Sequence, residues 1–153
     1  MIKKILKKIG KNSIISQKEI ASAAHEKRNA VLKLSSEIIS KNTNKIIEAN
    51  KEDLLLANKA GLKESYIDRL LLDSKRISTI AESLISISTL PDPLSGKITK
   101  WERPNGLVIS KQPTPLGVLG IIYESRPNVT VDASALCIKS GNSVILRCGS
   151  DSY

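Results

Sequence analysis

The sequence predicts an α/β fold, and three observations support this prediction. Apolar residues recur at helical spacing through residues 19–90, which is the pattern of amphipathic helices. An Asn105-Gly106 pair separates two short extended runs, and Asn-Gly is a strong signal for a hairpin turn. Two nearly all-apolar runs, residues 117–123 and 143–148, flank a helical segment, as expected for strands of a parallel sheet that is buried on both faces.

These observations divide the chain into three consecutive parts. We expect N-terminal helices over residues 1–93, a β-hairpin over 94–114, and the first, incomplete strand–helix–strand unit of a parallel sheet over 115–153. The length of 153 residues suits one domain or a portion of a larger one. Because only 3% of residues are aromatic and Phe is absent, the core must consist of Ile, Leu, Val and Ala.

Four helices are expected in the first part, at residues 19–40, 43–60 and 65–71 and from Ser74 to just before Pro91. The stop signals are a glycine after the second helix and the Pro-Asp-Pro run after the fourth. Ser74 is the predicted N-cap of the fourth. The predicted buried stripes are Ile20, Ala24, Val31, Leu34 and Ile38 in the first helix, Ile46, Ile47, Leu54 and Ala57 in the second, and Ile77, Ile80, Ala81 and Leu84 in the fourth.

The second half contains the predicted strands. The hairpin strands are expected at residues 97–103 and 107–112. The parallel pair is expected at 117–123 and 143–148, joined by a helix over 130–140 that stops at a glycine. Because parallel strands place their C-terminal ends at the same sheet edge, the two loops that follow them should lie together.

A candidate ligand site follows from that geometry. The first loop contributes Arg126 and Asn128, and the second contributes Arg147, Gly149 and Ser150. This combination suits an anion or a nucleotide. The alternative is that both arginines are surface or salt-bridge residues.

Other reactive side chains are sparse. Cys137 lies in an apolar helix and is expected to be buried and inert. Cys148 lies beside Arg147, which favours a thiolate, but no activating base is visible. His25 is expected to be an exposed helix residue rather than a catalytic base. No metal site is expected, because the cysteines are far apart and His25 is the only histidine.

The net charge of +9 comes largely from lysines near the N-terminus: Lys3, Lys4, Lys7, Lys8 and Lys11. A basic surface can attract nucleic acid or anionic membranes, but it is more commonly a solvated helix face. No aromatic residues interleave with these lysines, so we expect no nucleic-acid partner. Neither a signal peptide nor a membrane span is visible, so we expect a cytoplasmic protein without a membrane partner.

A family resemblance covers most of the chain. Residues Pro115 to Ser150 read PLGVLGIIYESRPNVTVDASALCIKSGNSVILRCGS. The strand Pro-Leu-Gly-Val, the loop Tyr-Glu-x-Arg-Pro-Asn-Val-Thr and the strand Gly-Asn-x-Val-Ile-Leu-Arg closely resemble the γ-glutamyl phosphate reductases, also called glutamate-5-semialdehyde dehydrogenases. The segments 48–53, 68–70 and 91–93 resemble the same family, so the resemblance runs from about Ile20 to the last residue.

The resemblance implies the aldehyde-dehydrogenase fold, with a Rossmann-type cofactor domain, a catalytic domain and an oligomerisation flap to which the hairpin would belong. The implied activity is the NADPH-dependent reduction of γ-glutamyl phosphate to glutamate 5-semialdehyde and phosphate, in proline biosynthesis. In the implied reaction, a cysteine thiolate attacks the acyl phosphate, and hydride then reduces the thioester to the aldehyde.

Only a few residue roles carry over from the family. Asn128 matches an asparagine that supports the developing oxyanion. Arg147 matches a position near the adenosine ribose of the cofactor, where it could meet the extra phosphate of NADPH, and Gly149 and Ser150 would line the same pocket. Arg126 would face the anionic substrate or brace its loop.

The chain also departs from the family. Family members are much longer, and neither Cys137 nor Cys148 lies in the context of the catalytic cysteine. We therefore expect little or no activity from the isolated chain, which would need a separate downstream fragment and could form a homo-oligomer. Two alternatives stay open: a non-catalytic interaction or subunit-binding module, and a basic binder of nucleic acid or membrane surfaces.

Overall fold

The computed structural model describes residues 2–96, 98–124 and 126–149. Within them lie six helices and four strands. The helices are α1 (Ile2–Ser22), α2 (His25–Lys41), α3 (Thr43–Lys59), α4 (Glu64–Leu70), α5 (Ser74–Thr89) and α6 (Pro127–Lys139), and the strands are β1 (Thr99–Glu102), β2 (Val108–Lys111), β3 (Val118–Ile122) and β4 (Ser143–Arg147).

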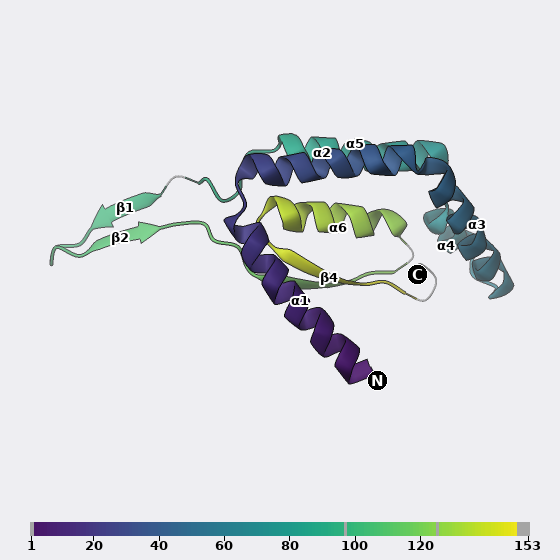
Figure 1. The fold of residues 1–153 in the computed structure, drawn as a ribbon, viewed down its shortest axis with the longest axis horizontal. Coiled ribbons are helices and arrows are strands. Elements are labelled where there is room, and N and C mark those ends of the chain that lie inside the picture. Colours follow the sequence, from purple (N-terminus) through teal and green to yellow (C-terminus); the bar gives the residue numbers. More distant parts are fainter. Residues whose placement is uncertain (1, 97, 125, 150–153) are drawn as a thin grey trace.

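The elements form stacked layers (Figure 1). Helices α2 and α5 lie side by side and make the most extensive helix–helix contact, and α6 packs beneath them. The strands β3 and β4 lie on the opposite side of α6 (Figure 1). The centre of this stack is an apolar cluster of Leu32, Leu84 and Ala135, one residue from each of the three helices.

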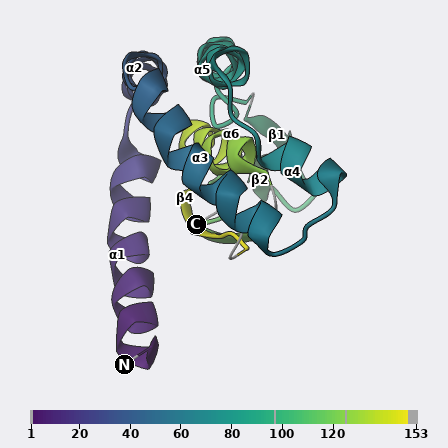
Figure 2. The ribbon, with the colours of Figure 1, turned by 90° about the vertical axis from the view of Figure 1, so that its right-hand side faces the viewer.

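The N-terminal helices differ from the prediction of one helix over residues 19–40. The chain forms α1 and α2, which are separated by an extended residue, Ala24, with ψ 152°. Helix α1 therefore leaves the line of α2 and contacts β4 (Figures 1 and 2). The break is a tertiary effect, since the sequence around Ala24 contains neither Pro nor Gly.

The buried face of α2 also differs from the prediction. Val31, Leu34 and Ile38 are 43%, 56% and 51% exposed, whereas Leu32 is 1% exposed and faces α5 and α6. Polar residues explain the difference, because they share the buried face with Leu32. The hydroxyl of Ser36 is buried and donates to the backbone carbonyl of Ala81 in α5 at 2.7 Å.

The next three helices agree with the prediction to within one or two residues. The predicted stripe of α5, from Ile77 to Leu84, is buried. Gly61 has φ +68° after α3, which is the left-handed conformation that favours glycine at a helix end. One detail was wrong: the N-cap of α5 is Asp73, whose carboxylate accepts from the backbone N–H of Arg76 at 2.7 Å, and Ser74 is already helical.

The predicted hairpin is present, with shorter strands than expected. Strands β1 and β2 are antiparallel and pair Thr99 with Lys111 and Glu102 with Val108. Gly106 has φ +81°, as a tight Asn-Gly turn requires. The hairpin projects away from the layers (Figure 1).

The strand–helix–strand unit is also present. Strands β3 and β4 are parallel, with Val118 opposite Ser143 and Ile122 opposite Arg147. Helix α6 begins at Pro127, three residues earlier than predicted. Proline is well tolerated in the first turn of a helix, because the backbone N–H groups of that turn have no acceptor within the helix and proline lacks this N–H. Apolar runs of this kind suit strands that are covered on both faces, but one face of the pair is bare in this chain, since Ile122 is 83% exposed and Val118 is 36% exposed.

Candidate functional site

The C-terminal ends of β3 and β4 lie at one sheet edge. The backbone N–H of Tyr123, which follows β3, donates to the carbonyl of Arg147 at 3.0 Å. The Arg147 side chain is exposed at the end of β4, and its guanidinium donates to the carbonyl of Cys148. Gly149 follows and is half-buried, whereas Ser150, also predicted here, lies outside the described residues.

The other predicted residues lie at the start of α6. Arg126 immediately precedes the helix and is exposed. Asn128 is the second residue of the helix, and its Nδ2 donates to Oδ2 of Asp132, one turn later, at 3.0 Å. No hydrogen bond within the described ranges joins either residue to Arg147.

Asn128 lies in a pocket of about 240 Å³ between α4, α5 and the first turns of α6. We call it the α6 pocket. Its lining residues are Arg69, Leu71, Leu72, Arg76, Thr79, Ile80, Ser83, Pro127, Asn128 and Asp132.

Three charged side chains line the α6 pocket. The carboxylate of Asp132 accepts from the Ser83 hydroxyl at 2.9 Å as well as from Asn128. The guanidinium of Arg76 pairs with Asp68 at 2.7 Å. The guanidinium of Arg69 lies 5.5 Å from the centre of the Tyr66 ring, a cation–π distance.

The residues that surround Asn128 in this pocket were not predicted from the sequence. Asp132 carried a usable signal, because it follows Asn128 by four residues and such pairs share a helix face. Arg69 lay inside a segment of the family resemblance, but no role was attached to it. Arg76 and Ser83 come from a helix whose position over α6 is decided only by tertiary packing.

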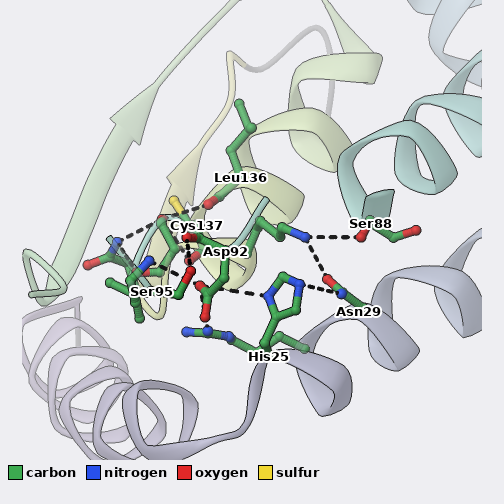
Figure 3. Close-up of polar contacts among 12 residues, drawn as sticks. His25, Asn29, Ser88, Asp92, Ser95, Leu136 and Cys137 are labelled. Atoms are coloured by element: carbon green, nitrogen blue, oxygen red, sulfur yellow. Dashed lines mark hydrogen bonds and ion pairs between the residues drawn. The ribbon is translucent and has the colours of Figure 1, made fainter. Parts of the chain in front are cut away.

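A second polar cluster lies near the C-terminal end of α6 (Figure 3). We call it the polar seam, because it joins α2, α5 and α6. It consists of His25, Arg28, Asn29, Ser88, Asp92 and Lys139.

The polar seam is held by short contacts. The Nζ of Lys139 donates to Oδ1 of Asn29 at 2.7 Å and to the carbonyl of Ser88 at 3.0 Å. The Nη2 of Arg28 donates to Asp92 at 2.9 Å. Arg28 and Lys139 are only 4% and 3% exposed, and burial lowers the pKa of Lys139 below its ordinary value.

His25 belongs to the polar seam, so the expectation of an exposed helix residue was wrong. Its Nε2 lies 2.9 Å from Nδ2 of Asn29, and its Nδ1 is buried, 3.7 Å from Asp92. The sequence could not reveal this contact, because Asp92 is 67 residues away and approaches only when α5 packs on α2.

The two cysteines offer no assembled nucleophile. Cys137 is buried in α6, and burial raises the pKa of its thiol. Cys148 is half-buried after β4. Within the described ranges, no three metal-binding side chains come together, and no helix is both long and apolar enough to cross a membrane.

Comparison with known proteins gives consistent relatives. The chain is 47% identical over 151 residues to a gamma-glutamyl phosphate reductase of Brucella suis, covering 99% of this chain and 36% of the relative. It is 52% identical over 144 residues to the gamma-glutamyl phosphate reductase of Allorhizobium ampelinum, covering 94% and 34%. The chain thus spans about a third of the length of the curated relatives that it matches. No family model matches it.

Solved structures agree with the sequence comparison. The crystal structure of gamma-glutamyl phosphate reductase from Thermotoga maritima matches with a TM-score of 0.87 and 39% identity, over 93% of this chain and 34% of that chain. The crystal structure of gamma-glutamyl phosphate reductase from Saccharomyces cerevisiae also matches with a TM-score of 0.87, at 34% identity. The match covers 95% of this chain and 37% of that chain. A Corynebacterium glutamicum benzaldehyde dehydrogenase matches with a TM-score of 0.67 at 20% identity, over 92% and 28%. These matches confirm the family resemblance and the aldehyde-dehydrogenase-like fold.

Proposed function

We propose that this chain, a homologue of the gamma-glutamyl phosphate reductases over nearly its whole length, supplies part of the active site of such a reductase. The proposed reaction is the NADPH-dependent conversion of γ-glutamyl phosphate to glutamate 5-semialdehyde and phosphate, in the cytoplasm, as a step of proline biosynthesis. The observation that carries the proposal is 47% identity across 99% of the chain, together with a TM-score of 0.87 against a reductase structure.

Arg147, Gly149 and Ser150 are the proposed cofactor contacts. Arg147 is exposed at the C-terminal end of a parallel strand, where open α/β sheets bind ligands, and it pairs with no carboxylate among the described residues. Its guanidinium therefore fits a phosphate group, as the NADPH ribose phosphate would require. NADPH, when bound, would supply the hydride that reduces the acyl carbon.

Asn128 is the proposed donor to the acyl oxygen. A carboxylate can only accept hydrogen bonds, so the contact with Asp132 requires that the amide nitrogen of Asn128 face the carboxylate. A side-chain amide nitrogen carries two N–H groups. This contact uses one N–H and leaves the second for an oxygen that gains negative charge. Arg126, exposed just before α6, is a proposed contact of the anionic substrate.

The nucleophile is proposed to come from the part of the relatives that this chain does not span. Cys137 is a poor candidate, because it is buried and its pKa is raised, which disfavours the thiolate. The projecting hairpin β1–β2 is proposed to act as an oligomerisation flap, and β3 and β4 are proposed to pair with strands of the part of the relatives that this chain does not span.

A chimera tests this proposal directly. Residues 1–153 of this chain would replace the matching third of the Brucella suis relative. NADPH absorbance would be followed in the reverse direction with glutamate 5-semialdehyde, phosphate and NADP⁺. We expect turnover by the chimera and none by the isolated chain.

Two variants assign roles within the chimera. Asn128→Ala should lower kcat about 10²–10³-fold, as loss of one oxyanion donor does. Arg147→Gln should raise KM for NADP⁺ with little change in kcat, because it removes a contact made equally before and during reaction. Arg103→Gln, in the exposed hairpin turn, is the matched control. Turnover by the isolated chain that survives Asn128→Ala but is lost with Cys148→Ser would place the nucleophile in this chain and contradict the proposal.

A further inference from the structure

The α6 pocket contains opposite charges that do not neutralise each other. Its carboxylate, Asp132, forms no ion pair among the described residues. Of its two guanidiniums, Arg76 is paired with Asp68, whereas Arg69 pairs with no carboxylate in the described ranges. One negative and one positive group therefore border the same cavity without a counter-ion.

Asp132 has unused hydrogen-bonding capacity. A carboxylate offers about four acceptor positions. Ser83 donates to Oδ1 and Asn128 donates to Oδ2, so each oxygen retains one position. Both donors are neutral, so they orient the carboxylate without compensating its charge. A ligand ammonium is the group that would supply both a counter-charge and the missing donors.

Arg69 is arranged to accept a carboxylate. Its guanidinium lies over the Tyr66 ring, with Cζ 5.5 Å from the ring centre, a cation–π distance. The edge of a guanidinium carries five N–H donors in a fork that matches a carboxylate, and none of them has a hydrogen bond among the described residues. The ring contact limits the orientation of the fork, which lowers the entropic cost of binding.

The size and charge of the pocket select the ligand class. A volume of about 240 Å³ is smaller than the pockets that hold drug-sized molecules and suits a small metabolite. A ligand with a single charge would desolvate one of the two groups without pairing it, which is costly. A ligand carrying both charges pairs both groups at once.

We infer that the α6 pocket recognises the zwitterionic head of an α-amino acid, with Asp132 binding the α-ammonium and Arg69 binding the α-carboxylate. The identification of that amino acid as a glutamyl group rests on the proposed function. Asn128 lines the same pocket and shares Asp132, so the charged head and the proposed oxyanion donor belong to one cavity. The pocket would thereby set the specificity of the enzyme for an amino-acid acyl group.

The experiment uses the full chain and three small probes. L-Glutamate 5-methyl ester carries both charges, monomethyl glutarate lacks the amino group, and methyl 4-aminobutanoate lacks the α-carboxylate. Dissociation constants would be measured by two-dimensional NMR, following the amide signals of α6. We expect the glutamate ester to bind at least about tenfold more tightly than either analogue, since each analogue loses a charged hydrogen bond.

Variants then assign each charge to its partner. Asp132→Asn should abolish the preference for the glutamate ester over monomethyl glutarate and leave the other preference intact. Arg69→Gln should abolish only the preference over methyl 4-aminobutanoate. Arg103→Gln, an exposed arginine of the hairpin turn, should change neither. The wild-type comparison needs no variant, so it stands even if one variant fails to fold.

The outcomes separate this inference from the proposed function. Equal binding of the three probes, or no binding of the glutamate ester, would overturn the inference. If the chimera still turned over and still depended on Asn128, the proposed function would stand and the charged head would be bound elsewhere. If the glutamate ester bound selectively but the chimera were inactive, the pocket assignment would stand without the reductase activity.

Discussion

The two ends of α6 carry polar clusters of opposite character. At the C-terminal end, the polar seam is buried, and its lysine and its central arginine each find a partner within the chain. At the N-terminal end, the α6 pocket is open and retains a carboxylate and a guanidinium without counter-ions among the described residues. Buried charges that hydrogen-bond between helices join elements, whereas accessible unpaired charges are available to a ligand. The first cluster is therefore structural and the second is the functional candidate.

The largest expected effect on the free energy of unfolding comes from removing one ion pair from each cluster. In the polar seam, Arg28 pairs with Asp92 at 2.9 Å, and their side chains are 4% and 16% exposed. At the α6 pocket, Arg76 pairs with Asp68 at 2.7 Å, and their side chains are 39% and 66% exposed. Asp92→Ala should cost about 3–5 kcal/mol in the free energy of unfolding, because it leaves a buried guanidinium without its counter-ion. Asp68→Ala should cost about 0–1 kcal/mol, because water screens its pair.

Urea-induced unfolding of the two variants measures this difference. Similar costs would mean that the seam is hydrated in solution, and the structural assignment of that cluster would be wrong.

A second prediction concerns the apolar layer between the clusters. Leu32 is 1% exposed and Leu34 is 56% exposed on the same helix. Leu32→Ala should lower the free energy of unfolding by about 2–5 kcal/mol through loss of burial and creation of a cavity. Leu34→Ala should change it by about 0.5 kcal/mol or less. Urea-induced unfolding measures both changes. A larger loss of unfolding free energy for Leu34→Ala than for Leu32→Ala would mean that the buried face of α2 is the one that its sequence predicts.

The smallest effect is a pH dependence of the seam. Burial lowers the pKa of Lys139 from its ordinary value of 10.5, with attraction to Asp92 opposing the shift and repulsion from Arg28 adding to it. Between the lowered pKa and 10.5, the unfolded chain holds a proton that the folded chain has released. Stability contributed by this residue therefore rises as the pH rises through that window.

Lys139→Met removes the titration. The difference in unfolding free energy between wild type and Lys139→Met should grow as the pH rises toward 10.5 from below, whereas Lys33→Met on the exposed face of α2 should give a flat difference. A difference that shrinks with pH would mean that Lys139 is stabilised in its charged form. The neutral amine still has two N–H groups, so both of its hydrogen bonds can persist.

Much of the architecture was predictable because its signals are local. Helix α3 ends where Gly61 supplies a left-handed residue, and the hairpin turns at Asn105-Gly106 for the same steric reason. The apolar runs of β3 and β4 predicted a parallel pair, since such strands face covered layers on both sides. In this chain one side is bare at Ile122, which is 83% exposed.

The candidate site was predictable only in part. Asn128 and Arg147 were found from their positions after apolar strands and from the resemblance, and their roles stay predictions. Arg69 and Ser83 could not be placed, because they reach Asn128 only after α4 and α5 have packed over α6. His25 was misjudged for the same reason, since its surroundings come from distant segments.

By itself, the sequence determined the order and type of the elements from α3 to β4 and the family to which the chain is homologous. These depend on turn chemistry, apolar periodicity and local motifs, all of which act over a few residues. Only the tertiary structure decided which face of α2 is buried, where α1 separates from α2, and which charges pair. Those outcomes depend on contacts between residues far apart in the chain, such as Lys139 with Asn29, 110 positions away. The free energies of such contacts exceed the local conformational preferences that they override.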